Sequence, residues 1–192
     1  MSIKHPIISV TGSSGAGTST VKHTFQQIFR RESVKAVTLE GDAFHRYNRK
    51  EMKKELEKRH AAGDATFSHF SFDANLLPEL EDCFRNYSEQ GTCRYRHYIH
   101  NSNEENLYGA KPGNFTKWKK FEEPSDLLFY EGLHGAVVNE EINLARYADL
   151  KIGVVPVINL EWIQKIHRDT DSRGYSTEAV TDTILRLSLI HI

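Results

Sequence analysis

The sequence predicts an α/β fold in which a mostly parallel sheet lies between layers of helices. Short apolar runs of the kind that are buried on both faces of a parallel sheet recur at 7–10, 34–40, 127–130 and 150–155. Segments with helical spacing of apolar residues lie between these runs. Such βα repetition predicts a parallel sheet covered on both faces, with ligands bound outside the carboxyl ends of its strands.

The composition is that of an ordinary globular domain. The 192 residues suffice for a single hydrophobic core, and 39% of them are hydrophobic and 27% charged. With 25 basic and 26 acidic side chains the formal charge is −1, so we expect neither nucleic acid nor an anionic membrane as a partner. No apolar run approaches a membrane span, and we therefore expect a cytoplasmic protein. We interpret Cys83 and Cys93, which lack any metal-ligand pattern, as free thiols.

The first apolar run leads into a loop of glycines and small side chains, Gly12-Ser13-Ser14-Gly15-Ala16-Gly17-Thr18-Ser19-Thr20. Such a loop curls tightly enough for successive backbone N–H groups to point at one anion. A helix predicted over 21–31 would add the partial positive charge of its N-terminus. Strand, loop and helix in this order form the P-loop arrangement, and we interpret these loop residues as a nucleotide-phosphate site.

The loop departs from the P-loop consensus at one position, because Thr18 stands where the lysine belongs. Gly12 and Gly17 have the consensus spacing, and Ser19 stands where the Mg²⁺-binding hydroxyl belongs. Taken alone, the loop also fits a plain turn between a strand and a helix. If it binds a triphosphate, a cation from elsewhere in the chain must replace the missing lysine.

The second predicted strand, 34–40, places Asp42 at the same sheet edge as the glycine loop. We interpret Asp42 as a catalytic carboxylate, although an Asp after Gly is also common in turns and helix caps. A largely solvated helix is predicted over 48–62, in which Arg49 lies close to the candidate site. A further helix over 78–87 turns its apolar residues inward.

The basic and aromatic segment 93–100 alternates like a strand and predicts an antiparallel addition, whereas residues 101–124 predict turns. The run 127–130 then ends in Glu131-Gly132. An acidic residue at the end of such a strand suits Mg²⁺ coordination beside a P-loop, so Glu131 is our metal candidate. A plain loop residue is the alternative for Glu131.

The last run, 150–155, precedes a helix over 158–167 whose Leu160, Ile163 and Ile166 we expect to face inward. Several cations and carboxylates follow between 165 and 176, where the helix gives way to a glycine-containing turn. Arg binds phosphate bidentately, so we expect this mobile segment to close over the nucleotide and supply the missing charge. A solvated loop with internal ion pairs is the alternative.

Longer motifs carry a resemblance to a known family. The stretch Lys165-Ile166-x-Arg168-Asp169-x-x-x-Arg173-Gly174-x-Ser176-x-Glu178, the lysine-less loop, and the segments 40–45 and 130–135 resemble bacterial phosphoribulokinase. The resemblance implies a three-layer P-loop NTPase domain with a mostly parallel sheet and antiparallel additions. It also implies phosphoryl transfer from ATP to the primary hydroxyl of ribulose 5-phosphate, which gives ribulose 1,5-bisphosphate for carbon fixation in the Calvin cycle.

The resemblance implies a role for each matching residue. Asp42 would accept the hydroxyl proton, and Asp169 would hold metal or assist. Ser19 and Glu131 would place Mg²⁺. The implied cations that neutralise the phosphoryl group are Lys165, Arg168 and Arg173, and the implied sugar-phosphate residues are His45, Arg49, Tyr98 and His100.

The family chain continues past residue 192, and the last few residues here no longer resemble it. We therefore interpret residues 1–192 as a single P-loop kinase domain that is incomplete at its C-terminus. The resemblance implies that the full-length form is a homo-oligomer with NADH and AMP as candidate effectors. Plant-type relatives carry a redox cysteine in the glycine loop, and because residues 1–82 contain no cysteine we expect no thiol switch.

Two other functions stay open. A related uridine or pantothenate kinase would share the strand, the loop and the Arg-Asp pair, but local positive charge from His45, Arg49 and His100 favours a phosphorylated sugar. A nucleotide-binding regulator without catalysis fits Thr18 and the atypical C-terminal residues, and it predicts ATP binding without turnover.

Overall fold

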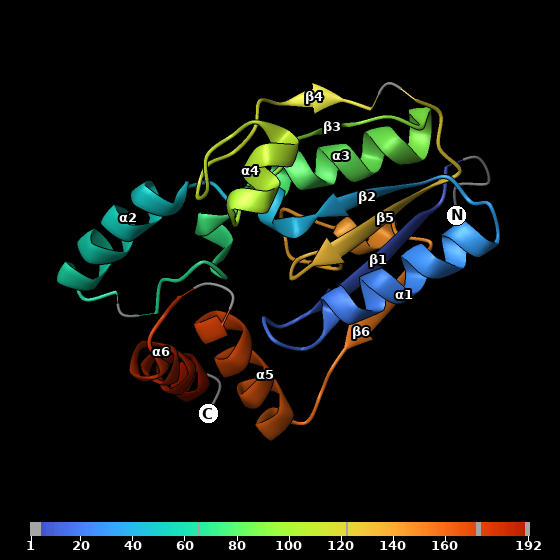
Figure 1. Ribbon diagram of the computed structural model, residues 1–192. Coiled ribbons are helices and arrows are strands. Elements are labelled where there is room, and N and C mark those ends of the chain that lie inside the picture. The colour runs from blue at the N-terminus through green and yellow to red at the C-terminus, as the bar shows by residue number, and fades with distance from the viewer. Residues whose placement is uncertain (1–4, 65, 122, 172–173, 191–192) are drawn as a thin grey trace.

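The computed structural model describes residues 5–64, 66–121, 123–171 and 174–190. A four-stranded parallel sheet lies at its centre, with the strand order β2-β5-β1-β6 (Figure 1). The strands are β1 (Ile7–Gly12), β2 (Ala36–Glu40), β5 (Leu127–Gly132) and β6 (Leu150–Val154). Because β1 pairs with both β5 and β6, the strand that leads into the glycine loop is central. The predicted parallel sheet is confirmed.

Helices cover both faces of the sheet. Helix α1 (Thr18–Arg31) packs on one face, where the rings of Phe25 and Phe29 contact Phe129 of β5. Helix α3 (Leu77–Gln90) covers the other face, where the ring centroid of Phe84 lies 5.4 Å from that of Tyr130. Neighbouring residues of a strand point to opposite faces, so Phe129 and Tyr130 anchor the two layers of helices. The predicted three-layer arrangement is confirmed (Figure 1).

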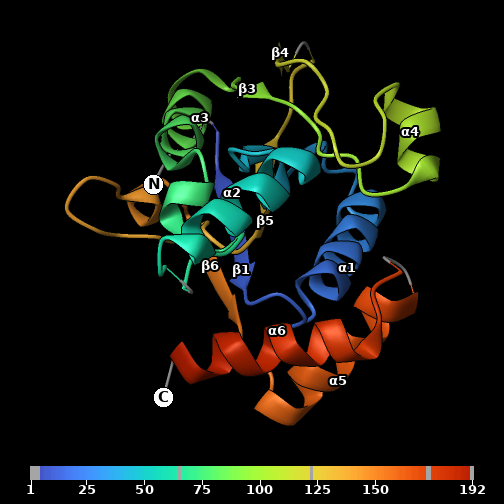
Figure 2. The same cartoon turned by 90° about the vertical axis from the view of Figure 1, so that its left-hand side faces the viewer.

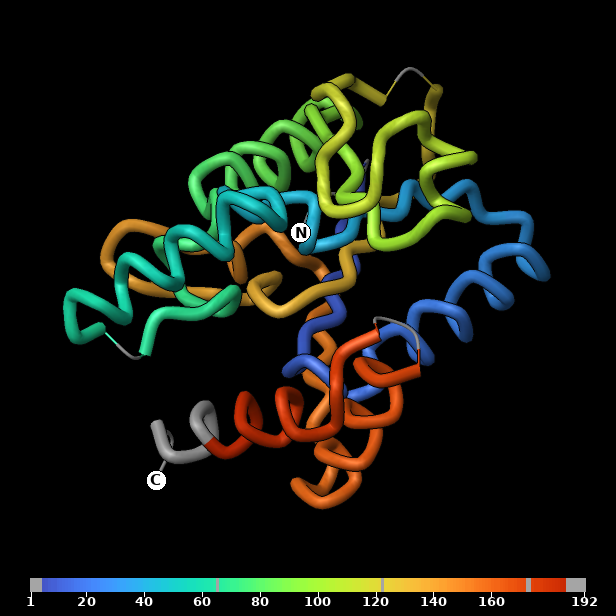
Figure 3. Tube along the Cα trace, turned by 60° about the vertical axis from the view of Figure 1, so that its left-hand side comes forward, coloured from blue at the N-terminus to red at the C-terminus, as the bar shows by residue number. Residues whose placement is uncertain are grey.

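The other elements lie outside the central sheet. Helices α5 and α6 lie side by side beneath the glycine loop (Figures 2 and 3). These elements are η1 (Gly41–Phe44), α2 (Arg49–Ala61), η2 (Phe72–Ala74), β3 (Arg94–Tyr95), α4 (Ser102–Tyr108), β4 (Lys119–Lys120), η3 (Leu144–Arg146), α5 (Ile158–Asp171) and α6 (Thr177–Ile190). Among the described residues, no helix is long and apolar enough to cross a membrane.

The segment 93–124 differs from the prediction in two ways. Only Arg94–Tyr95 of the expected strand is a strand, and it pairs antiparallel with β4, so the antiparallel addition is shorter than expected. The regular ladder stops after Tyr95, and the same two segments then form one isolated antiparallel bridge between Tyr98 and Phe115. The stretch expected to form turns contains helix α4, whose N-terminus is capped by the Asn101 side chain accepting from the backbone N–H of Glu104. The spacing Asn-x-x-Glu is a helix-start signal that the sequence analysis missed.

The interpretation of Cys83 and Cys93 as free thiols was wrong. The two residues form a disulfide, with their Cα atoms 4.9 Å apart. Cys83 lies on α3, and that helix ends at Gly91, whose φ of 72° is in the left-handed region that glycine adopts without strain. The chain reverses there and returns Cys93 to the side of the helix. The spacing of ten residues alone could not reveal this reversal.

The expected inward face of the helix over 158–167 was also wrong. Leu160 is 44% exposed and Ile163 is 53% exposed, although Ile166 is partly buried. Helix α5 instead turns polar side chains of its other face toward the glycine loop. The sequence pattern therefore located the helix correctly and assigned the wrong face to the interior.

Candidate active site

The fold brings the predicted phosphate and carboxylate groups to one edge of the sheet. The glycine loop follows β1, Asp42 follows β2, and Glu131 is the fifth residue of β5. All of these strands are parallel, and Glu40 of β2 is the register partner of Glu131. Because parallel strands end at the same edge, the loop and the two carboxylates lie at one end of the molecule, as predicted.

The glycine loop has the backbone of an anion site. Gly15 and Gly17 have φ angles of 101° and 96°, which glycine adopts readily and other residues do not. Thr18 then begins α1, so the loop lies at a helix N-terminus, where the partial positive charge favours an anion. A Cβ atom on Gly15 would lie 3.0 Å from the carbonyl oxygen of Glu161, so α5 packs directly against the loop.

Thr18, which occupies the position of the missing lysine, forms a hydrogen bond with Glu131, the residue that we expect to bind Mg²⁺. Its hydroxyl donates to Oε1 of Glu131 over 2.5 Å. On the next turn of α1, Nζ of Lys22 lies 2.7 Å from Oε1 of Glu40 and 3.6 Å from Oε2 of Glu131. Burial opposes the charge of Lys22, but the two carboxylates outweigh it and raise its pKa. Lys22 was not predicted from the sequence, although its place four residues after Thr18 puts both on one helix face.

Helix α5 supplies cations to the loop. Nη2 of Arg168 donates to Oγ of Ser14 over 2.8 Å. The buried Asp169 carboxylate accepts from Nζ of Lys165 over 3.0 Å and lies 2.8 Å from Nη2 of Arg168. The expected charges are therefore beside the loop, and the helix that carries them continues to Asp171, beyond the predicted end at residue 167. Arg173 lies outside the described residues.

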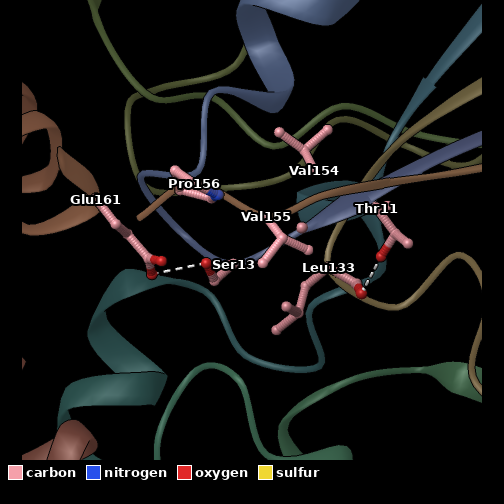
Figure 4. Close-up of a pocket in the computed structure, with 9 residues that line it drawn as sticks. Thr11, Ser13, Leu133, Val154, Val155, Pro156 and Glu161 are labelled. Atoms are coloured by element: carbon pink, nitrogen blue, oxygen red, sulfur yellow. Dashed lines mark hydrogen bonds between the residues drawn. The ribbon is translucent and has the colours of Figure 1, made fainter. Parts of the chain in front are cut away.

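A cavity of about 390 Å³ opens beside the glycine loop, where β1 and β6 end (Figure 4). Ser13 and Glu161 face each other across one side of it, with Oγ of Ser13 donating to Oε1 of Glu161 over 2.6 Å. The apolar part of its lining comes from Leu133, Val154, Val155 and Pro156. A mostly apolar pocket with a few placed polar groups is typical of a small-molecule site. The sequence carried no signal for Glu161 or for this lining.

Of the four predicted substrate residues, His45 and His100 contact Asp42, and the other two contact these histidines. Nε2 of His45 lies 3.2 Å from Oδ1 of Asp42, and Nε2 of His100 lies 3.4 Å from Oδ2. The ring of Tyr98 packs against both imidazoles, with centroid distances of 4.9 Å to His100 and 6.0 Å to His45. Nη2 of Arg49 donates to the carbonyl oxygen of His100. The Asp42 side chain is 44% exposed, so a substrate hydroxyl can reach it.

Two residues that the sequence analysis missed hold this cluster. Arg96 donates to the carbonyl oxygens of Ala43 (2.7 Å) and His45 (2.6 Å), and its guanidinium carbon lies 3.6 Å from the ring centroid of Phe115. Burial lowers the pKa of Arg96 to about 10. Asn75 binds the His45 ring, with Oδ1 2.9 Å from Nδ1. Both act on the cluster from distant parts of the chain, which is why local patterns did not reveal them.

The residues present fit a Mg²⁺ ion that is held partly by nucleotide. In the described part of the chain, no group of three or more His, Cys, Asp or Glu side chains could hold a metal ion. Mg²⁺ in nucleotide sites needs no such group, because it takes one or two protein oxygens together with phosphates and waters. Glu131 and Ser19 offer a carboxylate and a hydroxyl beside the loop, and Ser19 is exposed at the first turn of α1.

Comparison with known proteins gives the family. Residues 7–188 match the model of the phosphoribulokinase / uridine kinase family. The chain belongs to this family. It is 72% identical to phosphoribulokinase 1 of Cereibacter sphaeroides over 186 residues, which are 97% of this chain and 64% of that protein. It is 64% identical to the phosphoribulokinase of Nitrobacter vulgaris, with 95% of this chain and 63% of that one aligned.

A solved structure of phosphoribulokinase from Rhodobacter spheroides superposes with a TM-score of 0.82 at 67% identity, covering 98% of this chain and 65% of that one. A solved structure of a possible uridine kinase from Bacillus stearothermophilus superposes with a TM-score of 0.57 at 14% identity, which supports the fold alone. The chain thus spans about 64% of the length of the first relative that it matches.

Proposed function

We propose that this chain is a single P-loop kinase domain that transfers the γ-phosphoryl group of ATP to the primary hydroxyl of ribulose 5-phosphate. The observation that carries the proposal is the position of Asp42, which lies between two imidazoles at the same sheet edge as the glycine loop. An acceptor held at Asp42 would face a nucleotide held at the loop. The phosphoribulokinases that the chain matches support this acceptor.

The nucleotide side is built by the glycine loop and α5. Backbone N–H groups of the loop and the N-terminus of α1 would bind the β- and γ-phosphates. Arg168 and Lys165 would stabilise the charge on the phosphoryl group in place of the consensus lysine. Both cations already contact Asp169, so that carboxylate holds them beside the loop. The apolar cavity next to the loop would take the nucleoside.

The acceptor side is built around Asp42. His45, His100 and Arg49 would bind the phosphate of the sugar, and Tyr98 packs against both imidazoles. The carboxylate of Asp42 would accept the proton of the primary hydroxyl as its oxygen forms a bond to the γ-phosphorus. The bond from that phosphorus to the bridging oxygen breaks at the same time, and ADP leaves. Glu131 and Ser19 would hold Mg²⁺, which neutralises developing charge on the phosphates when bound.

Further expectations concern the whole protein. We infer that the full-length form is a homo-oligomer and that NADH and AMP are its candidate effectors. We place it in the cytoplasm, where its substrates ATP and sugar phosphate are found. Thiols are mostly kept reduced in that compartment, so the Cys83–Cys93 pair would be open to reduction there.

The test is ADP release by the purified chain with Mg²⁺-ATP and one of three acceptors, ribulose 5-phosphate, uridine or pantothenate. We expect turnover with ribulose 5-phosphate alone, and a loss of roughly 10²–10⁴-fold in kcat for Asp42→Asn, because the general base is removed. Asp82→Asn, which changes an exposed carboxylate on α3, is the matched control and should keep full activity. Turnover with another acceptor would move the assignment to that kinase, and ATP binding without turnover would favour a regulator.

A further inference from the structure

Asn75 is a buried amide whose orientation the structure fixes. Asn75 is only 3% exposed, and its backbone forms an isolated antiparallel bridge with that of His45. Nδ2 of Asn75 donates to the carbonyl oxygens of His69 (2.9 Å) and Ser71 (2.8 Å). Carbonyl oxygens only accept hydrogen bonds, so the amide nitrogen must occupy this position and Oδ1 must face His45.

This orientation determines which nitrogen of His45 carries a proton. Oδ1 of Asn75 can only accept, and it lies 2.9 Å from Nδ1 of His45, so Nδ1 carries a proton. The other nitrogen, Nε2, lies 3.2 Å from Oδ1 of Asp42. If Nε2 were unprotonated, its lone pair would face the carboxylate. A hydrogen bond to an ionised Asp42 therefore requires a second proton on the ring.

We propose that Asn75 is a positioning residue that holds His45 as an imidazolium against Asp42. The usual alternative for a histidine beside a carboxylate is a neutral ring that donates from Nε2 and leaves Nδ1 as an acceptor. Asn75 excludes that tautomer because its Oδ1 and an unprotonated Nδ1 would repel each other. The last step rests on the proposed function: the fixed positive charge of His45 binds the phosphate of the sugar at neutral pH.

The charged and titratable groups around His45 agree with this assignment. Burial opposes the charge, but the hydrogen bonds and charge of Asp42 and the hydrogen bond to Asn75 outweigh it and raise the pKa of His45. The guanidinium of Arg96 acts in the opposite direction. The remaining groups that face His45 or feel its charge are His69 (ring centroids 5.9 Å apart), Tyr98 (6.0 Å) and His134.

The direct test is ¹⁵N NMR of the native chain labelled at histidine, with the His45 signals identified by their absence in His45→Gln. We expect a titration midpoint above 6.5. Above that midpoint we expect the neutral ring to keep its proton on Nδ1. A neutral ring with its proton on Nε2, or a midpoint below 6.5, would overturn the proposal. This measurement needs no turnover, so its failure is distinguishable from failure of the proposed function.

Two variants separate Asn75 from Asp42 as the source of the tautomer. Asn75→Leu should let the neutral ring move its proton to Nε2 and should lower the midpoint by about one pH unit, because the acceptor at Nδ1 is lost. Asp42→Asn should also lower the midpoint but should keep the proton on Nδ1. Asn143→Leu, at the cap of η3, is the matched control and should change neither the titration midpoint nor the tautomer of His45. If folded Asn75→Leu kept the proton on Nδ1 of His45, the role of Asn75 would be contradicted. If that variant does not fold, the tautomer of His45 measured in the native chain decides whether the proposal stands.

Discussion

At the scale of residues, helix α5 brings positive charge beside a loop that lacks the consensus lysine. The Thr18 hydroxyl donates to Glu131. Arg168 donates to Ser14 of the loop, and Lys165 packs beside Gly15 while its Nζ donates to Asp169. The sequence indicated the need for such a replacement and the segment that supplies it. Lys22 was not foreseen, because its role depends on two carboxylates that come from different strands.

Lys22 bridges two acidic residues that would otherwise repel. Glu40 and Glu131 are register partners on neighbouring strands, and like charges in that arrangement are destabilising. We expect Lys22→Met to lower the free energy of unfolding by about 1–2 kcal/mol, since Glu40 is 40% exposed and water screens part of the repulsion. Urea denaturation measures the change.

Two further variants control the Lys22 experiment. Lys22→Arg should retain most of the stability, because it keeps the charge. Lys22→Met in a Glu40→Gln background should cost less than it does alone, since one of the two repelling carboxylates is gone. An equal cost in both backgrounds would show that Lys22 acts through packing and not through these charges.

At the scale of elements, the hydrophobic pattern predicted the four strands of the central sheet and the helices α1, α2, α3 and α5, but it did not predict α6. Helix α3 turns Phe84 and Tyr87 into the core as expected. Helix α5 has apolar residues on an exposed face because its polar residues bind the loop and Asp169, and periodicity alone cannot separate these cases. In segment 93–100 the antiparallel pairing is interrupted at Arg96, which bonds two backbone carbonyl groups next to Asp42, and it resumes with the bridge between Tyr98 and Phe115.

The end of β5 depends on a glycine that has no room for a side chain. A Cβ atom on Gly132 would lie 2.7 Å from the hydroxyl oxygen of Tyr130 and 2.8 Å from the backbone Cα of Gly41. We expect Gly132→Ala to lower the free energy of unfolding by about 1–3 kcal/mol, because the backbone after β2 must move. Thermal or urea unfolding measures it.

Gly153 of β6 is the matched control, because a Cβ atom there meets no atom within 4 Å. Gly153→Ala should leave the free energy of unfolding unchanged or raise it by about 0.4–1 kcal/mol. Equal destabilisation by the two substitutions would show that loss of strand glycine, and not the close approach of β2 to β5, is responsible.

At the scale of the whole molecule, the parallel sheet is what assembles the site. The rule that parallel strands end at one edge was enough to predict from sequence that Asp42, Glu131 and the glycine loop lie at the same edge of the sheet. It could not predict the contacts between elements that are distant in the chain, such as Arg168 with Ser14 or Asn75 with His45. These contacts depend on tertiary packing, which leaves no periodic signal in the sequence.

We propose above all that the nucleotide side at the glycine loop and the acceptor side at Asp42 act together to phosphorylate a sugar phosphate. The most direct measurement is ³¹P NMR of the chain incubated with Mg²⁺-ATP and ribulose 5-phosphate. We predict a second phosphate-ester signal on the sugar, at the primary hydroxyl, which appears in step with ADP and is absent with Asp42→Asn. Formation of ADP with inorganic phosphate and no new sugar ester would contradict the account, because the acceptor would then have no place at Asp42.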